Sequence, residues 1–483
     1  MGRPLQTQTV WSPMSLPNWL PGWPGSWKVG LVNSSSFVSA VTALALLATP
    51  ALAAERGSSE PLLLLEDALT LARGQNHALA ASALEVERME ERSAAVVTRR
   101  FPALKFDAIG NRLLKSMDFP FNAGVFGTYP GIGAVPATDT SVSVPTGFSG
   151  TVTATIAQPI IQQYRIGLNL EAVRLDKAVA QEDLRKDRQR VVAEVKSSYY
   201  KVSAIEAGVI ALRDLVRAIE DVDGLTGRYL AEGRVLRSEA LLVKARLARE
   251  RHSLSSSESE LATQHEHLNQ LLGRDLRTPF RVTDASEVVA SRAVLPLEEA
   301  RQRAVENRPE IRKVALQIEQ AENARRTANS QWIPDLTLLG TYARNFNYQV
   351  LPKEILTLGL WLSWEPWDWG RRGHEAHEQK VAADKARQGR QETQEQVEVE
   401  VGQRWRGVKD AAARLEAAHL SEEAAKAYLE DLRNKYREDA TLLQGVLEAQ
   451  ARRSAARHDF TDALAGYWSA TAELERTIGD ENS

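Results

Sequence analysis

One long pattern occurs twice in the chain, beginning at Leu65-Glu66-Asp67-Ala68 and again at Leu297-Glu298-Glu299-Ala300. The first copy continues to Phe101-Pro102-Ala103-Leu104 and the second to Ile333-Pro334-Asp335-Leu336, an offset of about 231 residues. Further on the offset falls to about 206, because the first copy carries some 25 additional residues in one loop. A repeat of this length is a duplicated unit of several elements and not a short solenoid module.

Each copy is expected to fold as a helix, two strands, a long helix and a shorter helix. In the first copy, the helical pattern ends at Pro102, because the residue before a proline is disfavoured in a helix. The elements expected there are a helix over 62–100, strands over 104–109 and 151–156 joined by a long loop over 115–150, and helices over 165–231 and 238–272, the last closed by Gly273. Those expected in the second copy are strands over 336–342 and 355–364, a helix over 371–438 and a last helix that ends at Gly479.

The lengths of these helices carry information about the architecture. A helix of about 67 residues is roughly 100 Å long at 1.5 Å per residue, and no compact domain holds two of them. The two shorter helices of each copy would together match one long helix if they were stacked end to end. We therefore expect a cylinder wall made of helices.

The second strand of the second copy alternates in a way that suits a membrane. Its even-numbered positions from Leu356 to Trp364 are apolar, whereas its odd-numbered positions are mostly small or polar, apart from Ile355 and Trp361. A soluble sandwich strand is the alternative for this segment alone. Four tryptophans favour the membrane, because aromatic residues gather at membrane interfaces; they are Trp361, Trp364, Trp367 and Trp369. Four strands cannot close a barrel, so a membrane-spanning chain must oligomerise, and a trimer supplies twelve.

Composition excludes several classes of protein. The net charge of −3 implies neither nucleic acid nor an acidic surface as a partner. Cysteine is absent, which excludes disulfides, thiolate chemistry, cysteine zinc sites and a lipid-bearing N-terminal cysteine.

The N-terminus resembles a secretory signal. The apolar run from Phe37 to Ala48 is followed by Ala51-Leu52-Ala53, a cleavage site of the A-x-A type. We expect a signal peptide over 1–53, with Met14 as an alternative start.

No enzyme is indicated by the sequence. The stretch His374-Glu375-Ala376-His377 spaces its histidines three apart and not four, and no Walker-type phosphate loop occurs. We expect no catalytic, cofactor or metal site.

Three motifs, in order and partly in duplicate, resemble the outer-membrane efflux protein family, the TolC-like ducts, over 62–479. The motif Trp364-Glu365-Pro366-Trp367-Asp368-Trp369-Gly370-Arg371-Arg372 resembles the family's strand-to-helix junction. Asn307-Arg308-Pro309-Glu310-Ile311 and Trp332-Ile333-Pro334-Asp335-Leu336 are similar to its helix segment and its helix-to-strand turn.

The resemblance implies a mainly α fold with a small β part. Duplicated long-helix hairpins of a homotrimer would form an α-barrel in the periplasm, and four strands per protomer would contribute to a shared twelve-stranded transmembrane β-barrel in outer-membrane lipid. The two structural repeats would cover 54–295, including a linker over 274–295, and 296–483.

Helix-hairpin tips of this family meet a periplasmic adaptor that an inner-membrane pump drives. By resemblance, the first tip is Glu232-Gly233-Arg234-Val235 and the second is Asp439-Ala440-Thr441-Leu442, in which Ala440 replaces the usual glycine. Glu448 and, in the first repeat, Glu239 are similar to acidic residues that constrict the pore in some members. An ordinary solvated glutamate is the alternative for both. A ring of them would favour cations.

The leading functional hypothesis is a passive, trimeric outer-membrane channel of a tripartite efflux system. The alternatives are a duct for type I protein secretion and, from a different class, a soluble periplasmic coiled-coil scaffold or adaptor. An adaptor should carry one hairpin flanked by small β-rich modules, whereas this sequence has two hairpins and few strands.

Overall fold

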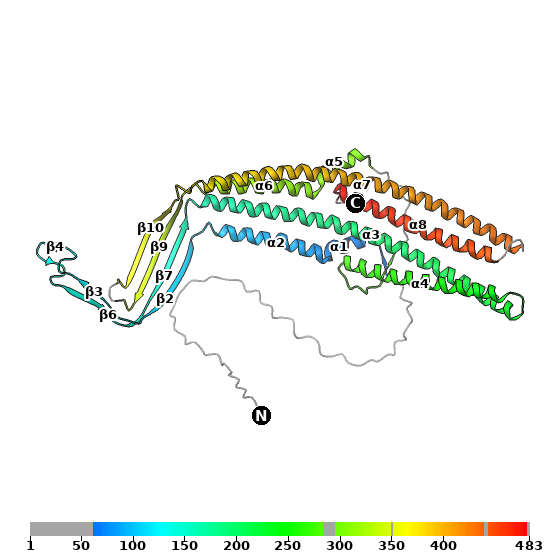
Figure 1. Cartoon of the computed structure of the whole chain (residues 1–483), viewed down its shortest axis with the longest axis horizontal. Coiled ribbons are helices and arrows are strands. Elements are labelled where there is room, and N and C mark those ends of the chain that lie inside the picture. Colours follow the sequence, from blue (N-terminus) through cyan, green and yellow to red (C-terminus); the bar gives the residue numbers. More distant parts are fainter. Residues whose placement is uncertain (1–60, 284–294, 349–350, 439–442, 481–483) are drawn as a thin grey trace, which may run out of the picture. The chain divides into compact units, whose positions relative to one another are not determined.

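The computed structural model describes residues 61–283, 295–348, 351–438 and 443–480 (Figure 1). The expected signal peptide, the second hairpin tip and half of the expected linker lie outside the described residues. No helix among the described residues is both long and apolar enough to span a membrane.

The repeat predicted from the sequence is present, with helices and strands close to the expected bounds. The main elements of the first copy are β1 (Leu62–Leu63), α1 (Leu65–Gln75), α2 (His77–Thr98), β2 (Ala103–Leu113), β7 (Gly147–Pro159), α3 (Gln163–Ala231), α4 (Arg237–Leu271) and β8 (Arg281–Val282). Those of the second copy are α5 (Leu297–Asn307), α6 (Pro309–Ser330), β9 (Asp335–Phe346), β10 (Glu354–Ser363), α7 (Arg371–Arg437) and α8 (Leu443–Ile478).

The expected loop over 115–150 was wrong in part, because it contains two small antiparallel ladders. Strand β3 (Met117–Phe121) pairs with β6 (Thr140–Val144), and β4 (Thr128–Tyr129) pairs with β5 (Gly133–Ala134). Figure 1 shows this extension beyond the ends of β2 and β7.

The first helix was also predicted wrongly, because it is interrupted at Asn76. This residue is extended, and its side-chain oxygen accepts hydrogen bonds from the backbone N–H groups of Ala78 (2.9 Å) and Leu79 (3.1 Å), which caps α2. Its side-chain amide donates to the carbonyl of Leu271 at 2.8 Å. The interruption therefore ties the start of α2 to the end of α4.

The short helices stack end to end as predicted. In the first copy α4 ends where α2 begins, and Gly273, at φ +70°, lies so close that a Cβ there would be 2.0 Å from the carbonyl oxygen of Gln75. In the second copy α8 ends against the α5–α6 break at Arg308, with Gly479 beside Asn307. The two largest hydrophobic cores lie at these two junctions, which α1 and α5 cover with alanines that are fully buried.

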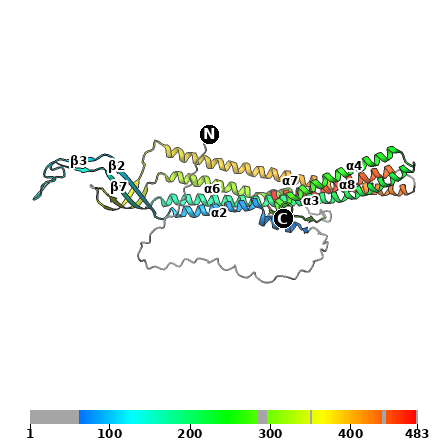
Figure 2. The same cartoon turned by 90° about the horizontal axis from the view of Figure 1, so that it is seen from below.

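The helices form a wall four helices wide. Helix α3 packs against α2 and α4 on one side and against α6 and α8 on the other, and α6 and α8 in turn pack against α7 (Figures 1 and 2). Helix α3 has 69 residues and α7 has 67, so each is roughly 100 Å long.

The four long strands form one antiparallel sheet at the end of the helices opposite the turn between α3 and α4 (Figure 1). Its order is β10-β9-β7-β2, so the strands from the two copies meet where β9 pairs with β7. Strands β10 and β2 are the edges of this sheet.

Candidate functional site

One face of the sheet is apolar and exposed. Leu356, Leu358, Leu360 and Leu362 project from β10 with exposed fractions of 80%, 79%, 65% and 63%. The register places further residues on the same face; they are Leu336, Leu338, Gly340 and Tyr342 of β9, Val152, Ala154 and Ile156 of β7, and Leu104, Phe106 and Ala108 of β2. A large exposed apolar surface of this kind marks a contact with lipid or protein.

The opposite face of the sheet is mostly polar. One row across all four strands consists of Lys105, Thr155, Thr341 and Thr357. Lys105 forms an ion pair with Asp107 on this face at 2.8 Å. The two faces thus suit two different surroundings.

The junction between β10 and α7 is held by contacts of a buried arginine. Arg372, 6% exposed, donates to the backbone carbonyl of Glu365 (2.5 Å) and to its carboxylate (2.7 Å). Asp368 accepts hydrogen bonds from the backbone N–H groups of Gly370 (3.1 Å) and Arg372 (3.0 Å). Gly370 has φ +87°, a conformation that glycine adopts without strain. The strand-to-helix motif is therefore a rigid corner.

The four tryptophans near this corner do not share one face. Trp364, Trp367 and Trp369 are 59%, 70% and 88% exposed, and the rings of Trp367 and Trp369 meet edge-on at 5.8 Å. Trp361 lies opposite Thr337 of β9, and so it projects from the polar face of β10. Their common place at a membrane interface stays a prediction.

Glu239 lies in the first turn of α4 and Glu448 in the second turn of α8, and both are exposed. The Glu239 carboxylate accepts a hydrogen bond from the backbone N–H of Leu236 at 3.3 Å, and Glu448 accepts one from the side chain of Gln444 at 3.0 Å. Neither carboxylate forms an ion pair with a described residue. Glu239 thus also caps its helix, which the sequence analysis missed although a capping residue at this spacing is recognisable.

The first hairpin tip is a tight turn. Gly233 has φ +71°, and the backbone N–H of Arg234 donates to the carbonyl of Tyr229 at 2.8 Å. The guanidinium of Arg234 lies 4.6 Å from the centre of the Tyr229 ring and 3.4 Å from the Glu232 carboxylate. The docking role of this tip stays a prediction.

A buried ionic network at the second junction was not foreseen. Arg308, 4% exposed, donates to Glu400 at 2.5 Å and to Glu310 at 3.1 Å, and Arg476 donates to Glu400 at 3.1 Å. Burial alone would raise the pKa of both carboxyls, but hydrogen bonds and charge attraction from Arg308 outweigh it, so each pKa lies below its usual value. Sequence spacing gave no signal, because Arg308 and Glu400 are 92 residues apart.

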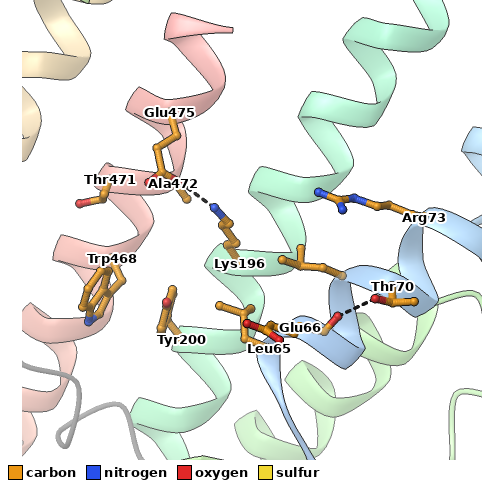
Figure 3. Close-up of a pocket in the computed structure, with 11 residues that line it drawn as sticks. Leu65, Glu66, Thr70, Arg73, Lys196, Tyr200, Trp468, Thr471, Ala472 and Glu475 are labelled. Atoms are coloured by element: carbon orange, nitrogen blue, oxygen red, sulfur yellow. Dashed lines mark hydrogen bonds and ion pairs between the residues drawn. The ribbon is translucent and has the colours of Figure 1, made fainter. Parts of the chain in front are cut away.

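A hollow of about 430 Å³ lies between α1, α3 and α8 (Figure 3). In its wall Lys196 donates to Glu475 at 2.7 Å, and the ring of Tyr200 stacks on Trp468 at 5.3 Å. Among the described residues no group of acidic or histidine side chains could hold a metal ion.

The model of the family described as "Outer membrane efflux protein" matches residues 68–274 and 300–480. The chain belongs to this family. The two matched segments coincide with the two copies of the repeat.

Solved structures with this fold include outer membrane channels and an outer membrane protein of other bacteria. The fold is similar to the CmeC outer membrane channel of Campylobacter jejuni, with 15% identity over 86% of this chain and 85% of that chain and a TM-score of 0.68. It is also similar to VceC of Vibrio cholerae, with 14% identity over 86% of this chain and 96% of that chain and a TM-score of 0.64. The open state of the MtrE channel of Neisseria gonorrhoeae is similar too, with 13% identity over 86% of this chain and 88% of that chain and a TM-score of 0.66. Comparison of the sequence with curated proteins gives no significant match.

Membership of the outer membrane efflux protein family settles the broad class of the chain. The family consists of channel proteins, so the chain is a transport protein and not an enzyme.

Proposed function

We propose that three copies of this chain form an outer-membrane channel, which passively conducts molecules that an inner-membrane pump and a periplasmic adaptor deliver. The observation that carries the proposal is the sheet, with its exposed apolar face, its polar opposite face and two long edge strands.

The edge strands support the trimer. Strands β10 and β2 have 10 and 11 residues, and their outer edges are unpaired within the described chain. Long exposed edges of this kind favour pairing with another chain. If β10 of each copy pairs with β2 of the next, three copies give a closed barrel of twelve strands, with the leucines of β10 toward lipid and the threonine row toward the pore.

The helices support a continuous passage. Three walls, each four helices wide, would close into a tunnel of twelve helices roughly 100 Å long. The expected signal peptide suits export to the periplasm, and the hairpin tips at the far end of the tunnel would meet the adaptor. Glu239 and Glu448, which lie within the first two turns of the helices after the tips, would line the entrance.

A pair of arginine substitutions tests the proposal. Leu358 and Thr357 are neighbours in the middle of β10 but lie on opposite faces. Arginine on a lipid-facing strand costs roughly 2–4 kcal/mol at the middle of the bilayer, whereas arginine in a water-filled pore has no such cost.

We expect L358R to disappear from the outer membrane and T357R to assemble normally with an altered ion preference. Immunoblots of membrane fractions and single-channel recordings measure both effects. Equal tolerance of the two variants would refute the lipid-facing sheet.

A further inference from the structure

Trp361 is an unusual residue on the polar face of the sheet. It lies in β10 between Leu360 and Leu362, which project from the apolar face, and the register places it directly opposite Thr337. Because side chains alternate along a strand, its indole shares a face with Thr337 and Thr357. Its side chain is 64% exposed.

The surroundings of Trp361 give no structural reason for an indole. Within the described residues no aromatic ring stacks on it and no cation lies over it. The four leucines of β10 have lipid as their expected neighbour, whereas Trp361, like Ile355, projects from the face that carries the threonines. An aromatic ring held on a polar, water-facing surface is available to bind a ligand.

Trp361 lies close to the sheet-to-helix junction. Its cross-strand neighbour Thr337 accepts a hydrogen bond at 3.0 Å from the side chain of Gln162, just before α3 begins. Trp361 itself lies two residues before the end of β10. The indole is therefore at the level where the barrel would join the helical tunnel.

We propose that Trp361 lines the pore at this level and contacts organic cations in transit. The inference rests on the proposed channel and deepens it by naming a residue and a class of cargo. Tryptophan is the side chain whose ring attracts cations most strongly, and an indole also offers apolar area to the organic part of such a molecule. A trimer would present three of these rings at one level.

The absence of cysteine from the chain makes the placement directly testable. The variants W361C and L360C each introduce one cysteine into the otherwise unchanged full chain. Single-channel current is recorded before and after the addition of a positively charged thiosulfonate, which reacts with cysteine and does not cross membranes. We expect the current through W361C to fall in up to three steps, one per subunit, and the current through L360C to stay constant. An unchanged current through W361C would overturn the pore placement.

A second set of variants keeps the test valid if W361C does not assemble. The probe is tetraphenylphosphonium, added to the channel while its block of the potassium current is measured. We expect W361L to raise the half-blocking concentration roughly two- to fivefold, which is the effect of one exposed cation–π contact, and W361F to lie between it and the wild type. The matched control L362A, on the apolar face of the same strand, should leave the block unchanged.

The outcomes separate the inference from the proposed function. If wild-type and W361L channels conduct but are blocked equally, the role of Trp361 is wrong and the channel stands. If the wild-type protein forms no channel, both proposals fall.

Discussion

Replacing Gly273 by alanine should loosen the junction between α4 and α2. Gly273 has φ +70°, which costs an alanine about 1–2 kcal/mol. Its new Cβ would lie 2.0 Å from the Gln75 carbonyl oxygen, about 1.4 Å short of ordinary contact, so backbone must move. That movement breaks the buried 2.8 Å hydrogen bond from Asn76 to Leu271, and an unsatisfied buried group costs about 1–3 kcal/mol. The junction should therefore lose about 2–5 kcal/mol.

Two other glycines provide matched controls with the same backbone conformation. Gly479, at φ +81°, has its nearest neighbour atom at 3.1 Å, and Gly233, at φ +71°, has no neighbour within 4 Å. G479A should therefore cost a little more than the conformational strain of about 1–2 kcal/mol, and G233A should cost that strain alone.

Hydrogen exchange followed by mass spectrometry measures these local costs, because amides in a loosened element exchange in proportion to its opening. Peptides on both sides of the junction should exchange at least about thirtyfold faster in G273A. The corresponding peptides of the second junction should change about five- to thirtyfold in G479A. Equal effects of G273A and G233A, each at its own site, would refute the close contact between the two helix ends.

Three further predictions concern the network, the entrance and the tip. R308A should destabilise the second junction, because it removes the main partner of two partly buried carboxylates; since Glu400 keeps Arg476, the cost should stay below the roughly 3–5 kcal/mol of a buried charge left without any partner. The pKa of Glu400 in the folded protein lies below its unfolded value near 4.5, so its contribution to folding stability is present above that pH and is lost as the pH falls through the lower folded value. The melting temperature of the wild type should therefore drop more steeply below about pH 4.5 than that of R308A. Parallel curves of melting temperature against pH would contradict this. The double variant E239Q/E448Q, which keeps the helix cap, should weaken cation preference in single-channel recordings; unchanged selectivity would mean that both carboxylates are merely solvated. A bulky residue at Gly233 should impair efflux without stopping trimer assembly, and normal efflux in a drug-accumulation assay would show that this tip does not dock.

The sequence predicts much of this fold because its signals are local. The repeat, the proline at the end of the first helix and the alternation in β10 all follow from neighbouring residues. The break at Asn76 is different, because that residue leaves the helix to bond with Leu271, 195 residues away. The ladders within 115–150 were missed because glycine and proline, which favour loops, also form their turns.

The residues of the candidate site likewise divide into those that local sequence signals predict and those that depend on contacts between distant segments. The apolar face of β10 was evident from its alternation, as was the first hairpin tip from its glycine. The contact of Arg308 with Glu400 depends on how distant segments meet in space, whereas the cap that Glu239 provides is local. Trp361 was grouped with its three neighbours by proximity in sequence, although the alternation already placed it on the other face of the strand, and the register with Thr337 places it on the polar face.

The mass of the native protein tests the shared barrel most directly. The protein would be extracted from outer membranes in detergent, and its mass measured with the detergent contribution subtracted. The account predicts a protein mass of three processed chains. A monomer or dimer recovered from the soluble periplasm would contradict it and would leave a coiled-coil scaffold as the better explanation.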